Sequence, residues 1–330
     1  MNGMDVPSEW ARHEYMKNKV LILGTTIESA GIGGVTIHIQ RLCQWLEREG
    51  YPFDFCDYKS VPILRQIKEI SAHKVIHIHA SNPYLRLFYI LLGKVLRVRT
   101  ILTVHGDLGR HSRMKNCFDK LSVRMCDCPV LINKHSYDIA LKSNENSRYI
   151  SAFIPPVSEV YLPESVERVI QTAKKNGLTI VATNASVMSF SDDGNEIYGI
   201  HFLVEYFRSR PGYFLCVSDP SSQYSTHYGG SAFENVIFIT ENHSFYHLLE
   251  LSDILIRATV TDGDSLSIKE GLFLKKTVLA TDCVDRPECV ILFHYNDSVS
   301  LDKALSEKSL SSCWKNEDVV DSIKELYTAL

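Results

Sequence analysis

The densest group of chemically useful side chains is the stretch Asp262-Gly263-Asp264-Ser265-Leu266-Ser267-Ile268-Lys269-Glu270. Asp262 follows a strand-like run, whereas Glu270 lies about one turn inside the next predicted helix. The amides at the start of that helix have no partner within it, and they attract anions such as a diphosphate. Carboxylates beside such donors suit the hydroxyl groups of ribose and hexose rings. The structural alternative is that Ser267 and Glu270 form a capping box and that Asp264 favours the helix dipole.

A second candidate site is the loop Gly31-Ile32-Gly33-Gly34, which lies between the apolar run Val20–Gly24 and a helical pattern at 35–49. Gly33 and Gly34 allow close approach to the backbone, and the helix that starts after them favours an anion. The loop lacks the third glycine of a dinucleotide fingerprint and the Gly-Lys-Ser/Thr of a Walker loop. An ordinary tight turn is the alternative.

Three histidines lie at the ends of strand-like runs. His77 and His79 alternate on one face of a strand end, and His105 ends the next strand. A His-x-His pair is typical of metal hydrolases, in which imidazoles hold zinc and a carboxylate activates water. The chain has no later set of His, Lys and Asp ligands on successive strand ends. We therefore expect no metal site.

These sites all follow predicted strands in a regular succession of strands and helices. Strands separated by helices require crossover connections and hence a parallel sheet, with ligands beyond the carboxyl ends of the strands. The first series has strands at 20–24, 74–78, 100–104 and 129–132. The second series runs through 178–183, 200–208, 214–218, 236–239, 245–251, 254–256, 266–274 and 277–280.

The succession breaks at Ile154-Pro155-Pro156-Val157, because consecutive prolines cannot continue a helix, and a polar segment follows them. This break predicts two α/β domains in sequence. We expect a polar leader at 1–18, an N-terminal Rossmann-like domain at 19–155, a C-terminal Rossmann-like domain at 156–310, and a C-terminal helix at 311–330.

Composition narrows the class of protein. The 330 residues are 45% hydrophobic and 22% charged, as in a globular protein, and the net charge of −4 gives no reason to expect a nucleic acid as ligand. Nine cysteines without framework spacing indicate reduced thiols and a cytoplasmic protein. The apolar stretch 83–98 is interrupted by Arg86, Lys94 and Arg97, so it is not a membrane span. We expect it to cover a sheet; the alternative is a helix lying on an anionic membrane surface.

Together these features resemble the GT-B retaining glycosyltransferases of family 4, which are common in bacterial cell-surface polysaccharide and lipopolysaccharide synthesis. The resemblance covers residues 19 to about 305 and depends on the order and spacing of short motifs. The matching residues are Gly33-Gly34-Val35 with His38, Val75-Ile-His-Ile-His79, Thr103-Val-His-Gly106, Tyr198-Gly-Ile-His-Phe-Leu203, Ser252-Asp253-Ile254, and Asp262 to Glu270, which looks like the family's Glu-x7-Glu element.

The resemblance implies an α/β protein with two Rossmann-like domains that face each other across a cleft, and with the C-terminal helix returning toward the N-terminal domain. It implies a hexosyltransferase that moves a sugar from a nucleotide-diphosphate sugar to a glycan or lipid-linked saccharide acceptor. Such enzymes need no metal and no cofactor. The expected location is the cytoplasm, with contact to the inner face of the cell membrane as a further option.

The resemblance also assigns roles to single residues. His105 lies beside the transferred sugar and Asp262 binds its hydroxyl groups, so these two are the catalytic candidates. His38 and His79 are candidates on the acceptor side. Glu270 binds the ribose, and the full donor-binding set is Gly33, Gly34, Val35, Arg257, Gly263, Asp264, Ser265, Leu266, Lys269 and Glu270.

The chain departs from the family pattern where the family clamps the diphosphate with an Arg and a Lys. Tyr198 stands where the Lys is expected, and no Arg is present in that region. Arg257 and Lys269 are the candidates to supply the charge. This departure leaves two alternatives open, a GT-B-like protein that binds sugar nucleotides without turnover, and a GT-B sugar-nucleotide epimerase.

Overall fold

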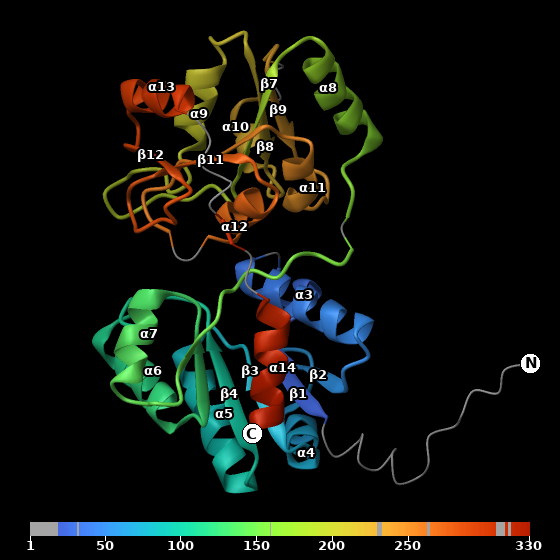
Figure 1. The fold of residues 1–330 in the computed structure, drawn as a ribbon, viewed down its shortest axis with the longest axis vertical. Coiled ribbons are helices and arrows are strands. Elements are labelled where there is room, and N and C mark those ends of the chain that lie inside the picture. Colours follow the sequence, from blue (N-terminus) through green and yellow to red (C-terminus); the bar gives the residue numbers. More distant parts are fainter. Residues whose placement is uncertain are drawn as a thin grey trace, which may run out of the picture. The chain divides into compact units, whose positions relative to one another are not determined.

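The computed structural model describes residues 19–31, 33–158, 160–229, 233–262, 265–307, 314–315 and 318–330 of the chain. These form two units, shown in Figure 1. Unit 1 comprises Met1–Val157 and Glu317–Leu330, and unit 2 comprises Ser158–Asn316. Among the helices of the described residues, none combines the length and the apolar character that a bilayer crossing requires.

Unit 1 is built on a six-stranded parallel sheet in the order β2-β1-β3-β4-β5-β6. Short apolar runs rich in Val, Ile and Leu form its inner strands, as expected where helices cover both faces. The strands are β1 (Val20–Gly24), β2 (Phe53–Asp57), β3 (Val75–Ile78), β4 (Arg99–Val104), β5 (Cys128–Leu131) and β6 (Arg148–Tyr149). The helices are α2 (Ile27–Ala30), α3 (Gly34–Arg48), α4 (Ile63–Ala72), α5 (Pro83–Leu96), α6 (Arg113–Met125), α7 (Lys134–Leu141) and α14 (Val319–Ala329).

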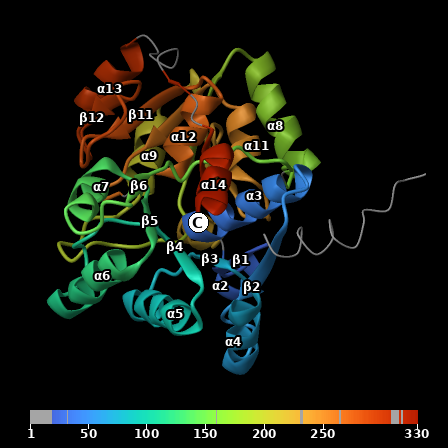
Figure 2. The same ribbon diagram turned by 60° about the horizontal axis from the view of Figure 1, so that its bottom comes forward.

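The two faces of this sheet are covered by different helices. On one face α4, α5, α6 and α7 supply buried residues that include Ile70, Ile90 and Val123. On the other face Leu42 of α3 and Ile323 of α14 pack against the strands. Figure 2 shows α14 beside α3, so the C-terminal helix returns to unit 1 as expected.

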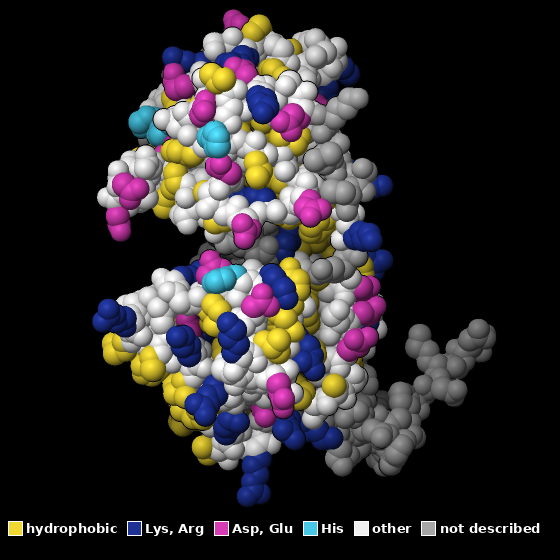
Figure 3. Space-filling view, turned by 60° about the vertical axis from the view of Figure 1, so that its left-hand side comes forward, with side chains coloured by type: hydrophobic (Ala, Val, Ile, Leu, Met, Phe, Trp, Pro, Cys, Tyr) yellow, Lys and Arg dark blue, Asp and Glu magenta, His cyan; other side chains and the backbone are white. Residues whose placement is uncertain are grey.

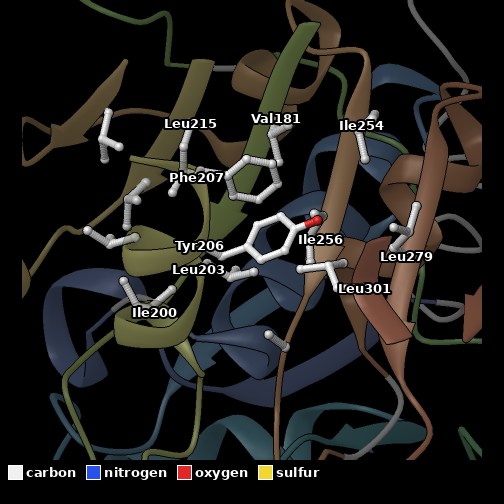
Figure 4. Packing of buried hydrophobic residues seen from close by; sticks show 14 of the residues in the cluster. Val181, Ile200, Leu203, Tyr206, Phe207, Leu215, Ile254, Ile256, Leu279 and Leu301 are labelled. Atoms are coloured by element: carbon white, nitrogen blue, oxygen red, sulfur yellow. The ribbon is translucent and has the colours of Figure 1, made fainter. Parts of the chain in front are cut away.

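Unit 2 repeats the same architecture, with a six-stranded parallel sheet in the order β12-β11-β10-β7-β8-β9. Figure 4 shows the cluster on one face, where Leu203 and Phe207 of α9 and Leu301 of α13 meet the strands. The strands are β7 (Thr179–Asn184), β8 (Tyr213–Ser218), β9 (Val236–Ile239), β10 (Ile254–Arg257), β11 (Thr277–Thr281) and β12 (Ile291–Phe293). The helices are α8 (Glu164–Lys175), α9 (Ile200–Phe207), α10 (Gln223–His227), α11 (Phe245–Glu250), α12 (Leu266–Phe273) and α13 (Ser298–Ser306). The α/β class with two Rossmann-like sheets is thus confirmed.

The start of the proline-rich break is tied to unit 1. Residues of α3 bind carbonyl groups in the break and just before it: His38 Nδ1 lies 2.8 Å from the oxygen of Ala152, Arg41 donates to Ile154 at 3.2 Å, and Trp45 donates to the oxygen of Pro155 at 2.6 Å. The polar segment after the prolines also contains a helix, α8. Its Val166, Ile170 and Ala173 are buried at helical spacing, although charged residues dominate its composition.

The docking of α14 depends on a buried hydrogen bond, which can be tested. Tyr327 Oη lies 2.7 Å from His77 Nδ1, and both side chains are buried. Tyr327→Phe removes the partner of a buried ring nitrogen, so we expect a loss of about 1–3 kcal/mol in the free energy of unfolding, measured by urea denaturation. The exposed Tyr161 provides the control, Tyr161→Phe. An equal effect of the two substitutions would contradict the prediction.

Candidate functional site

In unit 2 the order of the strands reverses between β7 and β10. These two strands are neighbours in the sheet, while β8 and β9 continue on one side and β11 and β12 on the other. Ligands of open parallel sheets bind beyond the carboxyl ends of the strands at such a reversal. Arg257, the last residue of β10, spans this point, because its Nη1 donates to Oδ1 of Asn184 at the end of β7 over 3.3 Å.

Two arginines meet one carboxylate at this edge of the sheet. Arg257 donates from Nε and Nη2 to Asp262 at 3.2 and 3.3 Å, and Arg286 donates from Nη1 to Asp262 at 2.9 Å. Arg286 also donates to Thr281 and Thr259, each at 3.3 Å. The side chains of Arg257, Asp262 and Arg286 are only 12%, 8% and 3% exposed. We call Arg257 and Arg286 the arginine pair; with Asp262 they leave one net positive charge at the strand ends.

The charge of Asp262 depends on these neighbours. Burial alone raises the pKa of a carboxyl group, but the arginine pair outweighs burial and holds the pKa of Asp262 below its usual value. Asp262 is therefore ionised at neutral pH. A charge-assisted contact to two guanidinium groups also fixes the positions of both arginines.

The aromatic ring of Tyr198 packs against Arg257 of the arginine pair. The guanidinium carbon of Arg257 lies 5.2 Å from the centre of the Tyr198 ring, a distance typical of a cation–π contact. Next to it, Gly199 has a φ of 60°, and a Cβ atom there would lie 2.2 Å from the carbonyl oxygen of Ala258. Only glycine permits this close approach, so the backbone at the start of α9 lies directly against the backbone that follows β10. Tyr198 thus stacks on a cation at the position where the family resemblance expects a Lys.

The other donor-side candidates of unit 2 lie in and before α12. Ser265 is the residue that precedes α12, and Leu266 is its first residue, whereas Gly263 and Asp264 lie outside the described residues. Lys269 and Glu270 are buried in the helix. The capping box is wrong: α12 begins at Leu266, so Ser267 is inside the helix and cannot cap it from outside.

In unit 1 the strand order reverses between β1 and β3. Gly33 and Gly34, which follow β1, are exposed at the start of α3, and a Cβ atom built on either would meet no described atom within 4 Å. Thr36 closes the turn, because its hydroxyl group accepts from the amide of Gly33 at 3.0 Å. Val35 packs partly against the core. Bare backbone at a helix start therefore lies at the reversal, where a ligand can approach it.

Four imidazoles gather at the carboxyl edge of the same sheet. His79 Nδ1 lies 2.9 Å from His105 Nε2, and His38 of α3 faces both rings. His77 is deeper in the sheet and has partners on both ring nitrogens, Tyr327 and Thr103, each at 2.7 Å. Burial lowers the pKa of His79 and of His105 well below the usual value, and the neighbouring imidazoles lower both further. Burial likewise lowers the pKa of His77, to about 3, so His77, His79 and His105 are neutral at pH 7.

Solved structures with the same architecture cover nearly the whole chain. HepE from Anabaena, in complex with UDP, matches with a TM-score of 0.65 and 12% identity over 94% of this chain and 100% of that chain. WaaG, a glycosyltransferase involved in lipopolysaccharide biosynthesis, matches with a TM-score of 0.59 and 13% identity over 94% and 100%. The UDP-GlcNAc 2-epimerase from Methanocaldococcus jannaschii matches with a TM-score of 0.59 and 12% identity over 94% and 99%. The chain has a GT-B fold.

No protein-family model matches this GT-B chain, and no curated protein is similar to it in sequence. At identities of 10–14% the solved structures establish the fold alone. They do not carry over any residue's role, so the chemistry must be argued from the side chains themselves.

Sequence reasoning missed two members of this site. Arg286 lies in the loop after β11, 24 positions beyond Asp262, and only the pairing of β10 with β11 brings the two together. Asn184 ends β7, where an amide side chain gives no distinct signal. A basic residue soon after a predicted strand end was the one sign that could have identified Arg286.

Removing the carboxylate tests whether the arginine pair depends on it. Asp262→Asn leaves two nearly buried cations without their counter-charge, so we expect a loss of about 3–5 kcal/mol in the free energy of unfolding at pH 7. Urea denaturation measures it. The control is Asp282→Asn, which breaks an exposed pair with His294 and should cost about 1 kcal/mol or less. Equal losses would contradict the assigned role.

The difference between wild type and Asp262→Asn should depend on pH in one direction. Because the folded-state pKa of Asp262 is lowered, its stabilising effect is complete above the unfolded value of about 3.9 and is lost as the pH falls through the folded value. We expect a constant gap between pH 5 and pH 7 and a shrinking gap below about pH 4. A gap that stays constant down to pH 2 would show that the carboxylate charge is not what stabilises the site.

Proposed function

We propose that this GT-B protein is a glycosyltransferase that takes a hexose-type sugar from a nucleotide-diphosphate donor. The observation that carries the proposal is the arginine pair at the strand-order reversal of unit 2. Two guanidinium groups in fixed positions suit the oxygens of a diphosphate, because a guanidinium fork matches phosphate geometry. The likeness of the fold to a UDP complex and to sugar transferases supports the same ligand class.

Transfer of the sugar leaves negative charge on the departing diphosphate. Arg257 and Arg286 stabilise that charge in surroundings from which water is largely excluded, where electrostatic interactions are strong. This arrangement requires no metal and no cofactor for the departure step. Asp262 keeps the arginine pair in position without ligand, and in the proposal its carboxylate also accepts hydrogen bonds from hydroxyl groups of the sugar.

The other donor contacts follow from α12. In the proposal Glu270 accepts from the ribose hydroxyl groups, and Lys269 adds positive charge near the diphosphate. The backbone amides of Gly263, Asp264, Ser265 and Leu266 at the start of the helix bind sugar or phosphate oxygens.

Unit 1 supplies the groups that act on the sugar and on the acceptor. His105, a neutral imidazole held by its hydrogen bond to His79, contacts the transferred sugar in this proposal, and His38 and His79 lie on the acceptor side. The exposed backbone of Gly33, Gly34 and Val35 approaches the donor phosphates and the acceptor. A retaining reaction of the family 4 type in cell-surface polysaccharide synthesis, with a glycan or lipid-linked saccharide as acceptor, is the specific form that we propose, acting in the cytoplasm.

A second candidate function has support from one finding. The fold is as similar to a UDP-GlcNAc 2-epimerase as to WaaG, each with a TM-score of 0.59, and the alternative we propose is that the donor site serves epimerisation. A protein that binds sugar nucleotides without turnover is the third form of the hypothesis, motivated by the missing Lys at Tyr198. The three differ in what happens to the bound sugar.

Activity is tested with a panel of nucleotide sugars, incubated with and without saccharide acceptors. Transfer to an acceptor supports the proposal, an epimerised nucleotide sugar formed without acceptor supports the epimerase, and binding with neither product supports the binding protein. The arginine pair is tested at the same time by calorimetry with UDP and with uridine. We expect Arg286→Ala to lower the affinity for UDP about tenfold or more and to leave the affinity for uridine unchanged, because charge-assisted contacts to the diphosphate are lost.

The matched control for Arg286 is Arg210, which pairs with Asp302 elsewhere in unit 2. Arg210→Ala should leave UDP affinity unchanged. If Arg286→Ala and Arg210→Ala bind UDP equally well, the diphosphate is not held by the arginine pair. An equal loss of affinity for UDP and for uridine would instead indicate that the substitution damages the fold.

We further propose that unit 1 contacts an anionic lipid surface. Helix α5 covers the sheet as expected, through Tyr89 and Ile90, but Tyr84, Phe88, Leu91 and Val95 form an exposed apolar stripe along it. Exposed basic residues lie on α5, at its C-terminal end and on the neighbouring α6: Lys94, Arg97, Arg113, Lys115, Lys120 and Arg124. Figure 3 shows hydrophobic and basic side chains interspersed on the surface of unit 1. Apolar residues within a basic surface are typical of helices that bind acidic headgroups.

Arg86, in contrast, does not belong to that basic surface. It is buried with Asp119, which accepts from its Nη1 at 2.7 Å, and its Nε donates to the oxygen of Ala80 at 2.6 Å. The ion pair ties α5 to α6 and to the end of β3. The charge that interrupts the apolar stretch at Arg86 is thus structural.

Membrane contact is measured by sedimentation with vesicles of phosphatidylcholine and phosphatidylglycerol. Phe88→Glu with Val95→Glu should weaken binding about tenfold or more, because apolar contact is lost and negative charge meets acidic lipid. Val299→Glu, an exposed apolar residue of α13 in unit 2, is the control. Binding that is unchanged by the double substitution, or that is equal with phosphatidylcholine alone, would contradict the proposal.

A further inference from the structure

Three of the imidazoles in unit 1 surround one point from three different elements. His38 belongs to α3, His79 follows β3, and His105 follows β4. Each ring offers one nitrogen, and these three nitrogens all lie within 4.8 Å of one another. His38 and His79 are buried, whereas His105 is partly exposed, so the cluster can be reached from solvent.

The spacing of the rings matches a known coordination geometry. Their centres are 5.0 Å apart for His38 and His105, 5.2 Å for His79 and His105, and 5.4 Å for His38 and His79. Three imidazoles bound to one tetrahedral zinc ion through bonds of about 2.0–2.1 Å have ring centres roughly 5 Å apart. The spacing of the three rings therefore suits one ion, and where His105 binds it through Nε2 the ion replaces the hydrogen bond to His79 Nδ1.

The surroundings of His38 resemble those of a metal-binding histidine. Its Nδ1 lies 2.8 Å from the carbonyl oxygen of Ala152, which can only accept, so Nδ1 carries the hydrogen. When the ring is neutral, Nε2 then carries the lone pair. A backbone carbonyl that fixes the outer nitrogen is the usual second partner of a metal-ligating imidazole. Arg41 and Trp45 bind the same stretch of chain and hold that carbonyl group in place.

His79 adds an independent observation. Its Nε2 is buried and has no hydrogen-bond partner among the described residues. Buried ring nitrogens in folded proteins almost always have a partner, so an unpaired one indicates a missing ligand. His77, only 4.1 Å from His79 between ring centres, has partners on both nitrogens and so is not a ligand.

We propose that His38, His79 and His105 bind one divalent transition-metal ion of the Zn²⁺ class. Three imidazoles favour zinc, cobalt, nickel and copper over magnesium and calcium, which prefer oxygen ligands. A water molecule or another small ligand completes the coordination. Although the sequence pattern led us to expect no metal, the ligand set includes His38, which is remote in sequence from the His-x-His pair.

The ion has no part in the proposed departure of the diphosphate. It occupies the lone pair of His105, the side chain that contacts the sugar in the proposed function, so the bound ion should inhibit transfer. This second statement rests on the proposed function, whereas binding of the ion does not. The two can fail separately, because ion binding is measured without any sugar nucleotide.

The test is calorimetric titration of the chelator-treated full-length protein with Zn²⁺, repeated with Co²⁺ to record the visible absorption of a tetrahedral site. We expect one ion per chain with micromolar or tighter affinity. His38→Ala and His79→Ala should each weaken binding roughly 100-fold and abolish the Co²⁺ absorption. The control is His135→Ala, an exposed histidine of α7, which should bind as the wild type does.

Circular dichroism of each variant separates loss of a ligand from loss of the fold, and His38→Gln serves where the alanine variant does not fold. No binding by the wild type, or binding that folded His38 and His79 variants retain, overturns the proposal. If the ion binds as expected but transfer by the chelator-treated enzyme is unaffected by it, only the inhibitory role is overturned.

Discussion

A parallel sheet gathers the carboxyl ends of its strands at one edge, and every polar group at that edge must find a partner. In unit 2 the groups at this edge pair with one another as ions: Asp262 lies between Arg257 and Arg286, and all three side chains are almost fully buried. A lone buried ion would be costly, and a carboxylate between two guanidinium groups offsets most of that cost. The two guanidinium groups and the one carboxylate together leave one net positive charge at the strand-order reversal.

Unit 1 meets the same constraint with uncharged groups. Neutral imidazoles occupy the edge, and α3 links them to the rest of the unit. One face of this helix packs in the core through Leu42 and Leu46, while His38, Arg41 and Trp45 bind the carbonyl groups of the chain that leaves the unit. Because successive side chains on one helix face are three or four positions apart, a single helix can both place an imidazole and fix the exit of the chain.

The order of elements was predictable from the sequence, because buried parallel strands such as Val20–Gly24 and Val236–Ile239 are continuous apolar runs between turn signals. Elements with mixed patterns were not predictable. The strand Phe53–Asp57 is only partly buried and follows a proline, and the charges of α8 concealed its buried stripe. For the site, the strand ends identified Asp262, Arg257 and the histidines. Arg286 required knowledge of strand pairing, which no local pattern contains.

The family resemblance predicts a Lys at the position of Tyr198, and the contacts of Tyr198 suggest a physical reason for the tyrosine. A cation at that position would point at Arg257, and the two like charges would repel each other. An aromatic ring instead stabilises the guanidinium group of Arg257 through its face. The second positive charge comes from Arg286, in the loop after β11, which the parallel pairing of β10 and β11 brings to the same point. The sheet fixes where the strands end and leaves open which loop carries a cation to that edge.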